Sequence, residues 1–579
     1  MCGIAGIALK PGAQISPDLV AALARGLAHR GPDGMGSHVS ARALLVQTRL
    51  AIIDLATGNQ PLFGAGSALI GNGEIYNNQE LRAQMRGVAW SSLSDCEPPL
   101  YIAHDWPDLI APLRGMYALA LDRGKAGDVL LARDPFGIKP LYIAATEHGL
   151  AFASEPQALI GAGLIKAQIR TKPLIELLQL QFTTGTNTMF SGIERVAPGE
   201  VLVVRDGDIT KRHAHPAIEP GHAPASEDQA LAKLDQILQN SVELHQRSDV
   251  PYGMFLSGGI DSAAILALMA RLNASKVLAF TAGFDTASVA DERDAAARAA
   301  QAVGARHERI EITEAMMWRH LPRIVAGMDD PAADYAIIPT WFLARHAAHA
   351  VKVVLSGEGG DEMFAGYGRY RAAMRPWPFR RAMRATGAFD GLGVLRAQDR
   401  GWRAGLAARQ ATIEGSRLSA AQRADIADWL PNDLLLKLDR CLMAHGVEGR
   451  TPFVDKEVAR FAFSLPDRLR VQQGYGKYLL RRWLAQHLPE ARPFAPKQGF
   501  DVPVSAWIAQ QGAALGALVA RAPIITELAE PAAVRQLFAR AADKKAGMAC
   551  WRLLFLALWH HRHGLGGGID GDVFEVLAG

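Results

Sequence analysis

The chain has 579 residues, of which 49% are hydrophobic and 21% are charged, a composition typical of a soluble globular protein. This composition excludes an intrinsically disordered chain, a collagen or a long coiled coil as the dominant state. The formal net charge is only +4, from 62 basic and 58 acidic residues, which is too balanced for a protein that coats nucleic acid.

The cysteine content and the lengths of the apolar segments indicate the cellular compartment. Cys2, Cys96, Cys441 and Cys550 are too few and too scattered for a disulfide framework or a zinc cluster. The N-terminal residues lack the basic start and the long apolar stretch of a secretory signal. The longest apolar stretches, such as residues 553–559, are well short of the ~20 residues that span a bilayer. We therefore expect a cytoplasmic protein with no membrane span and no nucleic-acid partner.

The N-terminal third of the chain contains short apolar segments separated by glycine-containing turns, a pattern typical of β-strands. The candidate strands are residues 4–9, 43–47, 67–70, 116–122, 129–132 and 201–204. Asp206-Gly207 is a turn signal, and the polar, proline-containing stretch after it predicts a linker over residues 206–226. This division gives two expected domains, residues 2–205 and residues 227–579.

After the linker, helical patterns appear alongside the strand patterns. Ser226 and Gln229 form a capping-box pattern before an apolar helical face, so a helix is expected to begin here. Beyond it, helical patterns alternate with short β-branched strands, which predicts a parallel sheet covered by helices. Arginine is frequent between residues 369 and 409. A solvated helical surface is the simpler interpretation of this stretch, and a dedicated anion site is the alternative.

Cys2 is the first candidate catalytic residue. If Met1 is removed, Cys2 carries both a thiol and a free α-amine. Because such an amine has a pKa of about 7.7–8, it can act as the base for the thiol of the same residue. Taken alone, however, a cysteine near a terminus is more often just a buried small residue.

Five polar motifs follow Cys2 at expected strand ends or turns. They are residues 29–34 (HRGPDG), 49–54 (RLAIID), 72–77 (NGEIYN), 94–97 (SDCE) and 133–142 (RDPFGIKPLY). Together with Met1-Cys2-Gly3, they closely resemble the glutaminase domain of class II, N-terminal-nucleophile glutamine amidotransferases. The resemblance implies an αββα sandwich of the Ntn-hydrolase type, and hydrolysis of L-glutamine at Cys2.

The same resemblance assigns a role to each motif residue. Asn72 and the backbone N–H of Gly73 would form an oxyanion hole, a donor pair of a kind that contributes ~10²–10³ in rate. A tight turn would also explain this dipeptide if it stood alone.

The remaining glutaminase residues would hold the substrate. Arg49 would pair with the α-carboxylate of glutamine, which suits a guanidinium fork. Asp95, together with Glu74, would receive the α-ammonium group. The other residues expected to bind glutamine are Leu50, Ala51, Ile52 and Ile53.

A second constellation follows the capped helix. Residues 250–256 predict a strand that is broken by a glycine-containing turn at residues 257–262 (SGGIDS), and residues 263–272 predict a helix. This unit points backbone N–H groups and a helix N-terminus at one spot, which favours anion binding. No Lys-Ser/Thr pair follows, so the turn is not a P-loop. It resembles the pyrophosphate loop of ATP pyrophosphatases, with a plain turn as the alternative.

A second acidic loop, residues 356–367 (SGEGGDEMFAGY), follows a predicted strand at residues 353–355. Asp261 and Asp361 would both lie at the carboxyl ends of strands, where ligands bind in open α/β sheets. Two carboxylates beside a triphosphate are ligands that Mg²⁺ prefers. Further motifs occur at residues 437–440 (KLDR), 443–445 (MAH), 448–455 (EGRTPFVD), 476–481 (GKYLLR) and 496–500 (PKQGF). The whole series is similar to the synthetase domain of glutamine-hydrolysing asparagine synthetase.

This second resemblance implies an ATP-pyrophosphatase-type domain with helical additions and a set of site residues. Those expected to bind ATP are Leu256, Ser257, Gly258, Gly259, Asp261, Ser262, Ala282, Ser356 and Gly357. Asp261 and Asp361 would hold Mg²⁺, and Lys477 would stabilise the charge that develops at phosphorus. Glu358 would take a proton from ammonia or hold the substrate amine. Asp439 would support the lysine or the substrate, or else be a buried salt-bridge carboxylate.

The implied reaction is ATP-dependent amidation of a carboxylate, with L-aspartate as the first expected acceptor. Ammonia from L-glutamine would attack an acyl-AMP intermediate, with release of AMP and pyrophosphate. The segment between Tyr367 and Lys437 is longer than in compact bacterial asparagine synthetases, so a larger cell-envelope or secondary-metabolite carboxylate is an alternative acceptor. A catalytically silent scaffold is the more remote alternative. Relatives of this kind are commonly dimers.

Overall fold

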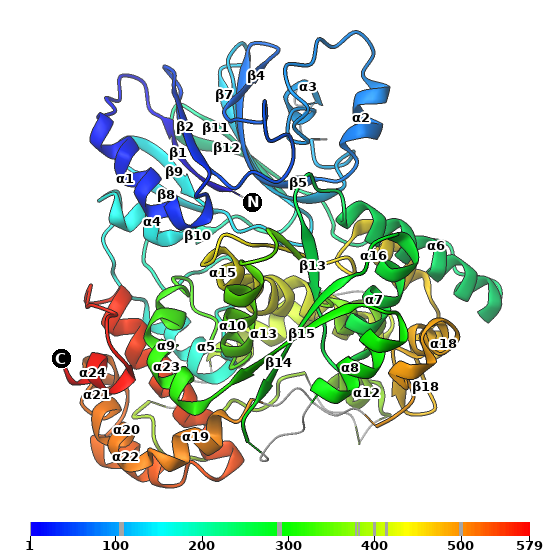
Figure 1. The fold of residues 1–579 in the computed structure, drawn as a ribbon. Coiled ribbons are helices and arrows are strands. Elements are labelled where there is room, and N and C mark those ends of the chain that lie inside the picture. Colours follow the sequence, from blue (N-terminus) through cyan, green and yellow to red (C-terminus); the bar gives the residue numbers. More distant parts are fainter. Residues whose placement is uncertain are drawn as a thin grey trace.

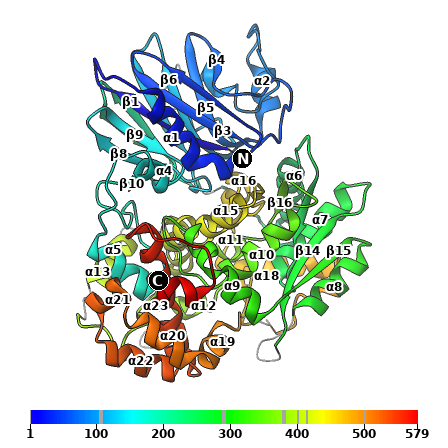
Figure 2. The ribbon, with the colours of Figure 1, turned by 60° about the vertical axis from the view of Figure 1, so that its left-hand side comes forward.

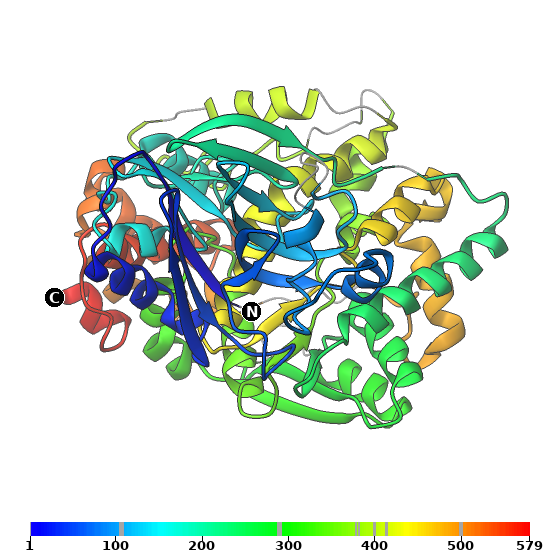
Figure 3. The same ribbon diagram turned by 90° about the horizontal axis from the view of Figure 1, so that it is seen from above.

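The computed structural model (Figure 1) describes residues 2–102, 109–219, 221–286, 292–376, 379, 383–397, 401–411, 415–496 and 502–579. Residues 497–500 of the motif at 496–500 lie outside these ranges. A β-sandwich formed by residues 2–214, here called the N-terminal region, rests on the C-terminal region, residues 226–579 (Figures 1 and 2). The chain ends on the opposite side of the molecule from helix α6 (Glu227–His245), as Figure 3 shows from above.

Two six-stranded antiparallel sheets form the sandwich. Their orders are β10–β8–β9–β1–β3–β2 and β12–β11–β7–β6–β5–β4. The first contains β1 (Gly3–Leu9), β2 (Gly34–Val39), β3 (Ala43–Arg49), β8 (Tyr142–Thr146), β9 (Gly149–Ala153) and β10 (Glu194–Arg195). The second contains β4 (Leu62–Gly64), β5 (Ser67–Ile75), β6 (Gly115–Arg123), β7 (Asp128–Arg133), β11 (Glu200–Arg205) and β12 (Asp208–Ala214).

The side chains of β1 show how the layers are built. Successive residues of a strand point to opposite faces. Ile4 and Ala8 therefore join the core between the two sheets, whereas Ile7 and Leu9 join the core under the helices. The helices of this region are α1 (Pro17–Leu27), α2 (Asn78–Gln84), α3 (Pro99–Ile102) and α4 (Pro156–Gly161), together with α5 (Thr171–Leu180), which packs against helices of the C-terminal region (Figures 1 and 2). Since α1 and α4 contact the first sheet and α3 contacts the second, the predicted αββα sandwich is confirmed.

The six predicted strands all lie within observed ones, but the expected linker is too long at its N-terminal end. Residues 208–214 form strand β12, which pairs antiparallel with β11. Asp206 and Gly207, both with positive φ, make the hairpin turn between them. This strand has no apolar pattern in the sequence because it is a largely exposed edge strand.

Five parallel strands form the sheet of the C-terminal region, in the order β15–β14–β13–β16–β17. They are β13 (Tyr252–Phe255), β14 (Leu278–Phe284), β15 (Arg306–Ile312), β16 (Val353–Leu355) and β17 (Glu448–Arg450). The predicted parallel sheet is confirmed. Helix α6 begins at the predicted cap, where the Ser226 hydroxyl accepts a hydrogen bond from the Gln229 N–H at 3.2 Å.

Helices surround this sheet and extend below it. They include α8 (Arg293–Ala302), α10 (Ile337–Ala347) and α15 (Leu435–Met443), which contact its strands, and α7 (Ile260–Leu272), α9 (Glu314–Ala326), α11 (Gly360–Phe364), α16 (Lys456–Ser464) and α18 (Tyr478–His487). Others are α12 (Gly368–Met374), α13 (Gly401–Ala411), α14 (Arg417–Ala424), a π-helix (Asp425–Leu434), α17 (Asp467–Arg470) and a small hairpin of β18 (Val471–Gln472) and β19 (Tyr475–Gly476).

The last helices form a packed subdomain at the C-terminal end. They are α19 (Val504–Gln510), α20 (Gly512–Val519), α21 (Pro523–Leu528), α22 (Pro531–Ala539), α23 (Lys544–His563) and α24 (Val573–Ala578). Two buried indoles of α23 tie this subdomain to the rest of the C-terminal region, because Trp551 donates to the Ala333 carbonyl and Trp559 donates to the Met328 carbonyl, both at 2.8 Å. None of the helices within the described ranges is long and apolar enough to cross a membrane.

The arginine-rich stretch is not simply a solvated surface. Arg369 and Arg384 approach the fully buried carboxylate of Asp425 at 2.7 and 2.8 Å. The Arg384 guanidinium also lies over the Trp429 ring, 4.4 Å from its centroid. These arginines therefore hold the π-helix in place through charge pairing and cation–π contact.

Candidate active sites

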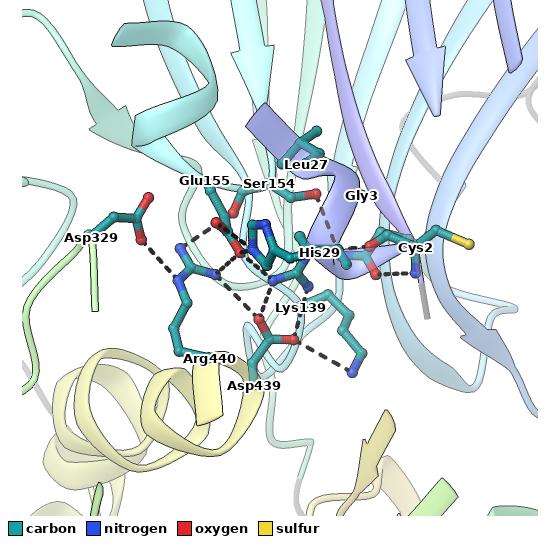
Figure 4. A network of polar contacts seen from close by, with 12 residues as sticks. Cys2, Gly3, Leu27, His29, Lys139, Ser154, Glu155, Asp329, Asp439 and Arg440 are labelled. Carbon is teal, nitrogen blue, oxygen red and sulfur yellow. Dashed lines mark hydrogen bonds and ion pairs between the residues drawn. The ribbon is translucent and has the colours of Figure 1, made fainter. Parts of the chain in front are cut away.

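Cys2 lies at the start of β1, at the end of the sandwich that faces the C-terminal region (Figure 4). The residue is only 8% exposed, and burial raises the pKa of its thiol. The backbone N of Cys2 donates to Asn72 Oδ1 at 3.3 Å. A thiol with a raised pKa stays protonated at neutral pH, so it requires a base close by in order to act as a nucleophile.

Asn72 and Gly73 lie beside Cys2 on β5. The Asn72 side chain is fully buried, and its Nδ2 donates to Ser154 Oγ at 3.5 Å. Gly73 has a φ of +152°, and a Cβ at this position would lie 2.0 Å from the Met116 carbonyl oxygen. Only glycine fits here, so the backbone conformation beside Cys2 depends on this residue.

The predicted glutamine-binding residues Arg49 and Asp95 are both buried. The Arg49 guanidinium is oriented by Asn59 Oδ1 and by the Asp54 carbonyl oxygen, each at 2.6 Å. Asp95 accepts a hydrogen bond from the Ile75 N–H at 2.7 Å, and burial raises its pKa to about 6. Asp95 is therefore charged at neutral pH and can receive an ammonium group.

Glu74 has a partner that sequence analysis did not foresee. Its Oε2 accepts a hydrogen bond at 3.0 Å from Arg450, a residue of β17 in the C-terminal region. Burial and the nearby Asp95 raise the pKa of Glu74 well above its usual value. Glu74 thus connects the predicted ammonium site to the parallel sheet.

The segment Leu50–Ile53 lines the same end of the sandwich. Leu50 and Ile52 are buried in a core shared with the C-terminal region. The Ala51 N–H donates to Asp33 Oδ2 at 2.8 Å, and the Ile53 carbonyl accepts from the Arg49 guanidinium at 3.5 Å. These contacts fix the backbone that follows Arg49.

A cavity of about 770 Å³ opens at the carboxyl ends of β13, β14 and β16. Every residue predicted to bind ATP lines it: Leu256, Ser257, Gly258, Gly259, Asp261, Ser262, Ala282, Ser356 and Gly357. The predicted residues Glu358, Asp361 and Lys477 line it as well. The cavity is therefore the place where the sequence motifs of the C-terminal region converge.

The turn at residues 257–262 is shaped by its own hydroxyl groups. Ser262 Oγ accepts a hydrogen bond from the Ser257 N–H at 3.1 Å, and Ser257 Oγ accepts one from the Gly259 N–H at 3.1 Å. Gly259 then caps the N-terminus of α7. A helix N-terminus behind a glycine turn concentrates N–H dipoles, which suits a phosphate group.

Asp261 and Asp361 converge on one cation, the ammonium group of Lys477. Lys477 Nζ lies 2.6 Å from Asp361 Oδ1 and is also hydrogen-bonded to Asp261. Burial alone would lower the pKa of Lys477, but the two carboxylates raise it. Two hard oxygen donors that already enclose a positive charge have the chemistry that a divalent cation requires. Within the described ranges, three or more candidate metal-ligating side chains do not cluster anywhere.

Glu358 is paired with a lysine that sequence analysis did not assign to the site. Lys437 Nζ lies 3.2 Å from Glu358 and 3.3 Å from Asp334. Lys437 is buried, and although burial opposes its charge, Glu358 and Asp334 raise its pKa. Glu362, beside Asp361, is fully buried, and burial together with Asp361 raises its pKa to about 8. The motif KLDR contained the only sequence signal for Lys437.

Asp439 does not contact Lys477, and of its two predicted roles the structure has the buried salt-bridge carboxylate. It accepts hydrogen bonds from Arg30 at 2.8 and 3.1 Å and from Arg440 at 3.2 Å. Lys139 Nζ approaches it at 4.0 Å. Figure 4 shows Asp439 between helix α15 and the sandwich, so the residue joins the two regions and does not face the cavity.

Two family models cover most of the sequence. One, described as asparagine synthase, matches residues 233–561, more than half of the chain. The chain belongs to the asparagine synthase family. The second model, a glutamine amidotransferase domain, matches residues 1–215. Its end agrees with the observed end of β12 and not with the shorter predicted domain.

Curated relatives give the same family along almost the whole length. A putative glutamine-hydrolysing asparagine synthetase of Mycobacterium tuberculosis is 33% identical, with 97% of each chain covered. Asparagine synthetase 1 of Bacillus subtilis is 33% identical with 88% of each chain covered. Asparagine synthetase B of Escherichia coli is 28% identical, with 84% of this chain and 79% of its own covered. This member of the asparagine synthase family is thus a ligase-type enzyme with an amidotransferase domain.

Proposed function

We propose that this chain amidates L-aspartate to L-asparagine, with nitrogen from L-glutamine and energy from ATP. The observation that carries the proposal is the pairing, in one chain, of a buried Cys2 site with a nucleotide-sized cavity lined by Asp261, Asp361 and Lys477. The names of the relatives support the acceptor. We assign residues 2–214 to the glutaminase reaction and residues 227–579 to the synthetase reaction.

The glutaminase reaction begins at Cys2. Once Met1 is removed, the α-amine of Cys2 accepts the thiol proton, and the thiolate attacks the side-chain amide carbon of glutamine. The oxyanion would receive hydrogen bonds from Asn72 and the Gly73 N–H. Collapse of this intermediate forms a thioester and expels ammonia, which takes up a proton from the α-ammonium of Cys2. Water then hydrolyses the thioester, so glutamate leaves and the thiol is restored.

The synthetase reaction takes place in the cavity. The side-chain carboxylate of aspartate attacks the α-phosphorus of ATP, and the bond to the bridging oxygen breaks to release pyrophosphate. Lys477 stabilises the charge on the phosphate oxygens, and the turn at residues 257–262 receives the pyrophosphate. Ammonia then attacks the acyl carbon and AMP leaves. Glu358 lies at the cavity wall, where it can take the proton that the attacking ammonia loses.

Asp261 and Asp361 are the residues that would hold Mg²⁺. When bound there, the ion supplies positive charge that neutralises the phosphate oxygens of the leaving group. Lys477, now shared between the two carboxylates, would then be free to turn toward the α-phosphate.

A charge cluster beside the cavity has the charges that an amino acid requires: Glu358 lines the cavity and pairs with Lys437, which in turn pairs with Asp334. Lys437 offers a cation, while Glu358 and Asp334 offer anions within 3.3 Å of it. An α-carboxylate and an α-ammonium group can be recognised together by such a mixed cluster. Aspartate meets this requirement and leaves its second carboxylate to react.

The experiment that tests this function supplies L-aspartate, L-glutamine, ATP and Mg²⁺ and follows asparagine, glutamate, AMP and pyrophosphate together. We expect equal rates of formation of all four products. Glutamate formation without aspartate-dependent AMP or asparagine would rule out aspartate as the acceptor.

A further inference from the structure

Helix α15 (Leu435–Met443) runs between the two reactive sites, and consecutive residues on it face different ones. Lys437 contacts Glu358 at the synthetase cavity, and Leu438 lines that cavity. The next two residues, Asp439 and Arg440, turn instead toward the sandwich (Figure 4). A helix with 3.6 residues per turn presents neighbouring residues to different sides, which makes this division possible.

Asp439 is connected to Cys2 through one residue, Arg30. Arg30 donates from Nη1 and Nη2 to the two carboxylate oxygens of Asp439, at 2.8 and 3.1 Å. The same guanidinium donates from Nε to the carbonyl oxygen of Cys2 at 3.3 Å. Because the guanidinium is planar and rigid, its bidentate pair with Asp439, together with the Glu155 carboxylate that accepts from Nη1 at 2.7 Å, fixes the direction of the Nε–H.

The pair is fully enclosed. Arg30 is completely buried and Asp439 is 3% exposed. Burial opposes the charge of Asp439, but Arg30 and Lys139 lower its pKa overall, so the carboxylate is ionised at neutral pH. A charged hydrogen bond in so dry an environment holds its geometry more tightly than a neutral one.

Arg440 gives a second connection to the same site. Its Nη2 donates to the Ser154 carbonyl oxygen at 3.4 Å. Ser154 Oγ in turn accepts hydrogen bonds from the Ile4 N–H at 3.0 Å and from Asn72 Nδ2 at 3.5 Å. Helix α15 therefore supports both the main chain of Cys2 and the amide predicted to bind the oxyanion.

We propose that Asp439 is a positioning residue of the glutaminase reaction, which acts by holding Arg30 so that its Nε–H fixes the Cys2 carbonyl. This inference rests on the proposed role of Cys2 as the nucleophile. With the Cys2 carbonyl fixed, rotation about the remaining bonds of Cys2 places the thiol against the substrate amide and beside the α-amine of the same residue. Helix α15, which belongs to the proposed synthetase, thus completes the glutaminase site. Among the described residues, no hydrogen bond or ion pair joins α15 to the predicted glutamine-binding residues Arg49 and Asp95.

The test compares two Asp→Asn variants of the full-length chain. Asp439→Asn weakens the pair with Arg30, whereas Asp455→Asn weakens a matched pair in which Arg114 donates to both carboxylate oxygens at 2.7 and 3.0 Å. Both carboxylates are buried, belong to the C-terminal region and bind an arginine of the sandwich. Asparagine also preserves the helix cap that Asp455 provides to α16.

We expect Asp439→Asn to lower kcat for glutamine hydrolysis by about 10- to 100-fold, since a misplacement of about 1 Å costs that much. KM for glutamine should change by less than about twofold, because the proposed substrate contacts are untouched. Asp455→Asn should leave both parameters within about twofold of the wild-type chain. An equal effect of the two substitutions, or a loss confined to KM, would overturn the positioning role.

A second variant separates positioning from folding. Arg30→Lys keeps the positive charge but lacks the Nε–H that reaches Cys2, so it should lower kcat to a similar degree. If Asp439 acts through Arg30, the double variant will be no slower than the slower single variant. Multiplied losses in the double variant would overturn the inference. Absence of glutamine hydrolysis in the wild-type chain would instead refute the proposed function itself.

Discussion

Around Cys2, which is only 8% exposed, hydrogen bonds with Asn72 and Arg30 hold the residue itself, and Thr48 and Ser154 hold Gly3 and Ile4 after it. Around Asp261 and Asp361, by contrast, a cavity of about 770 Å³ is open and Lys477 pairs with both carboxylates. The first site is assembled before its substrate arrives. In the proposed synthetase reaction, a nucleotide and a cation would replace Lys477 as the partner of these carboxylates, so we expect the geometry of the second site to depend on the ligands it binds.

The largest expected effect follows replacement of the nucleophile at the enclosed site. Cys2→Ala should abolish glutamine hydrolysis, a loss of about 10⁶-fold by analogy with other nucleophile deletions. Synthesis from added ammonium should continue, because the cavity of the C-terminal region is untouched. Parallel assays of asparagine formation with glutamine and with ammonium chloride measure both effects. Loss of the ammonium-dependent rate would remove the proposed division between the two sites.

The open site should be the more sensitive to charge. Asp261→Asn removes one of the two carboxylates proposed to hold Mg²⁺ and should lower pyrophosphate release by about 10²–10³-fold with either nitrogen source. Glutamine hydrolysis in the same variant serves as the control for folding. Unchanged pyrophosphate release would mean that Asp261 is not a metal ligand.

The buried ion pair of Arg450, which joins the two regions beside the Cys2 site, should make a large contribution to the free energy of unfolding. Arg450→Met leaves Glu74 and Glu448 without their buried guanidinium, at a cost of about 3–5 kcal/mol in the free energy of unfolding. The control is Arg271→Met, whose pair with Asp235 at 2.9 Å is partly exposed and should contribute under about 1 kcal/mol.

Chemical denaturation of both variants measures this difference. Similar losses in the two arginine variants would show that the buried pair has no special weight. A loss in Arg450→Met that exceeds the control by about 2 kcal/mol or more would support it.

The smallest expected effect is a pH dependence confined to the enclosed site. Burial raises the pKa of Asp95 to about 6, so this carboxyl is charged above pH 6 and becomes neutral below it. Since the neutral form cannot pair with the α-ammonium of glutamine, kcat/KM for glutamine should fall about tenfold more per pH unit below pH 6 than between pH 6 and 7, where only protonation of the Cys2 α-amine lowers it. Ammonium-dependent synthesis, corrected for free ammonia, should lack this limb. A glutamine profile whose slope does not steepen between pH 7 and pH 5 would remove Asp95 from binding.

Sequence motifs predicted the parts of each site that are contiguous in the chain. The turn at residues 257–262, the loop at residues 356–361 and the dipeptide Asn72-Gly73 each carry their chemistry within a few residues, so spacing alone identifies them. The strands followed from short apolar segments bounded by glycine-containing turns, for the same local reason.

The remaining contacts arise only when distant segments dock. Arg30 and Asp439 are 409 residues apart, and each looks like an ordinary charged residue on its own element. Lys437 could be noticed in its motif, but its pairing with Glu358 depends on how α15 packs against the sheet. Long-range ion pairs of this kind have no signature in a single sequence, because composition and periodicity report only on neighbours along the chain.

The polarity of the ion pairs across the boundary has a consequence for recombination between relatives. Arg30, Arg114 and Arg195 of the sandwich are matched by aspartates of the C-terminal region, whereas Arg440 and Arg450 run the opposite way. A chimera that joins the sandwich of one relative to the synthetase of another would bury any charge whose counterpart differs. The two regions are therefore interchangeable only between proteins in which these five arginines meet carboxylates at the same positions.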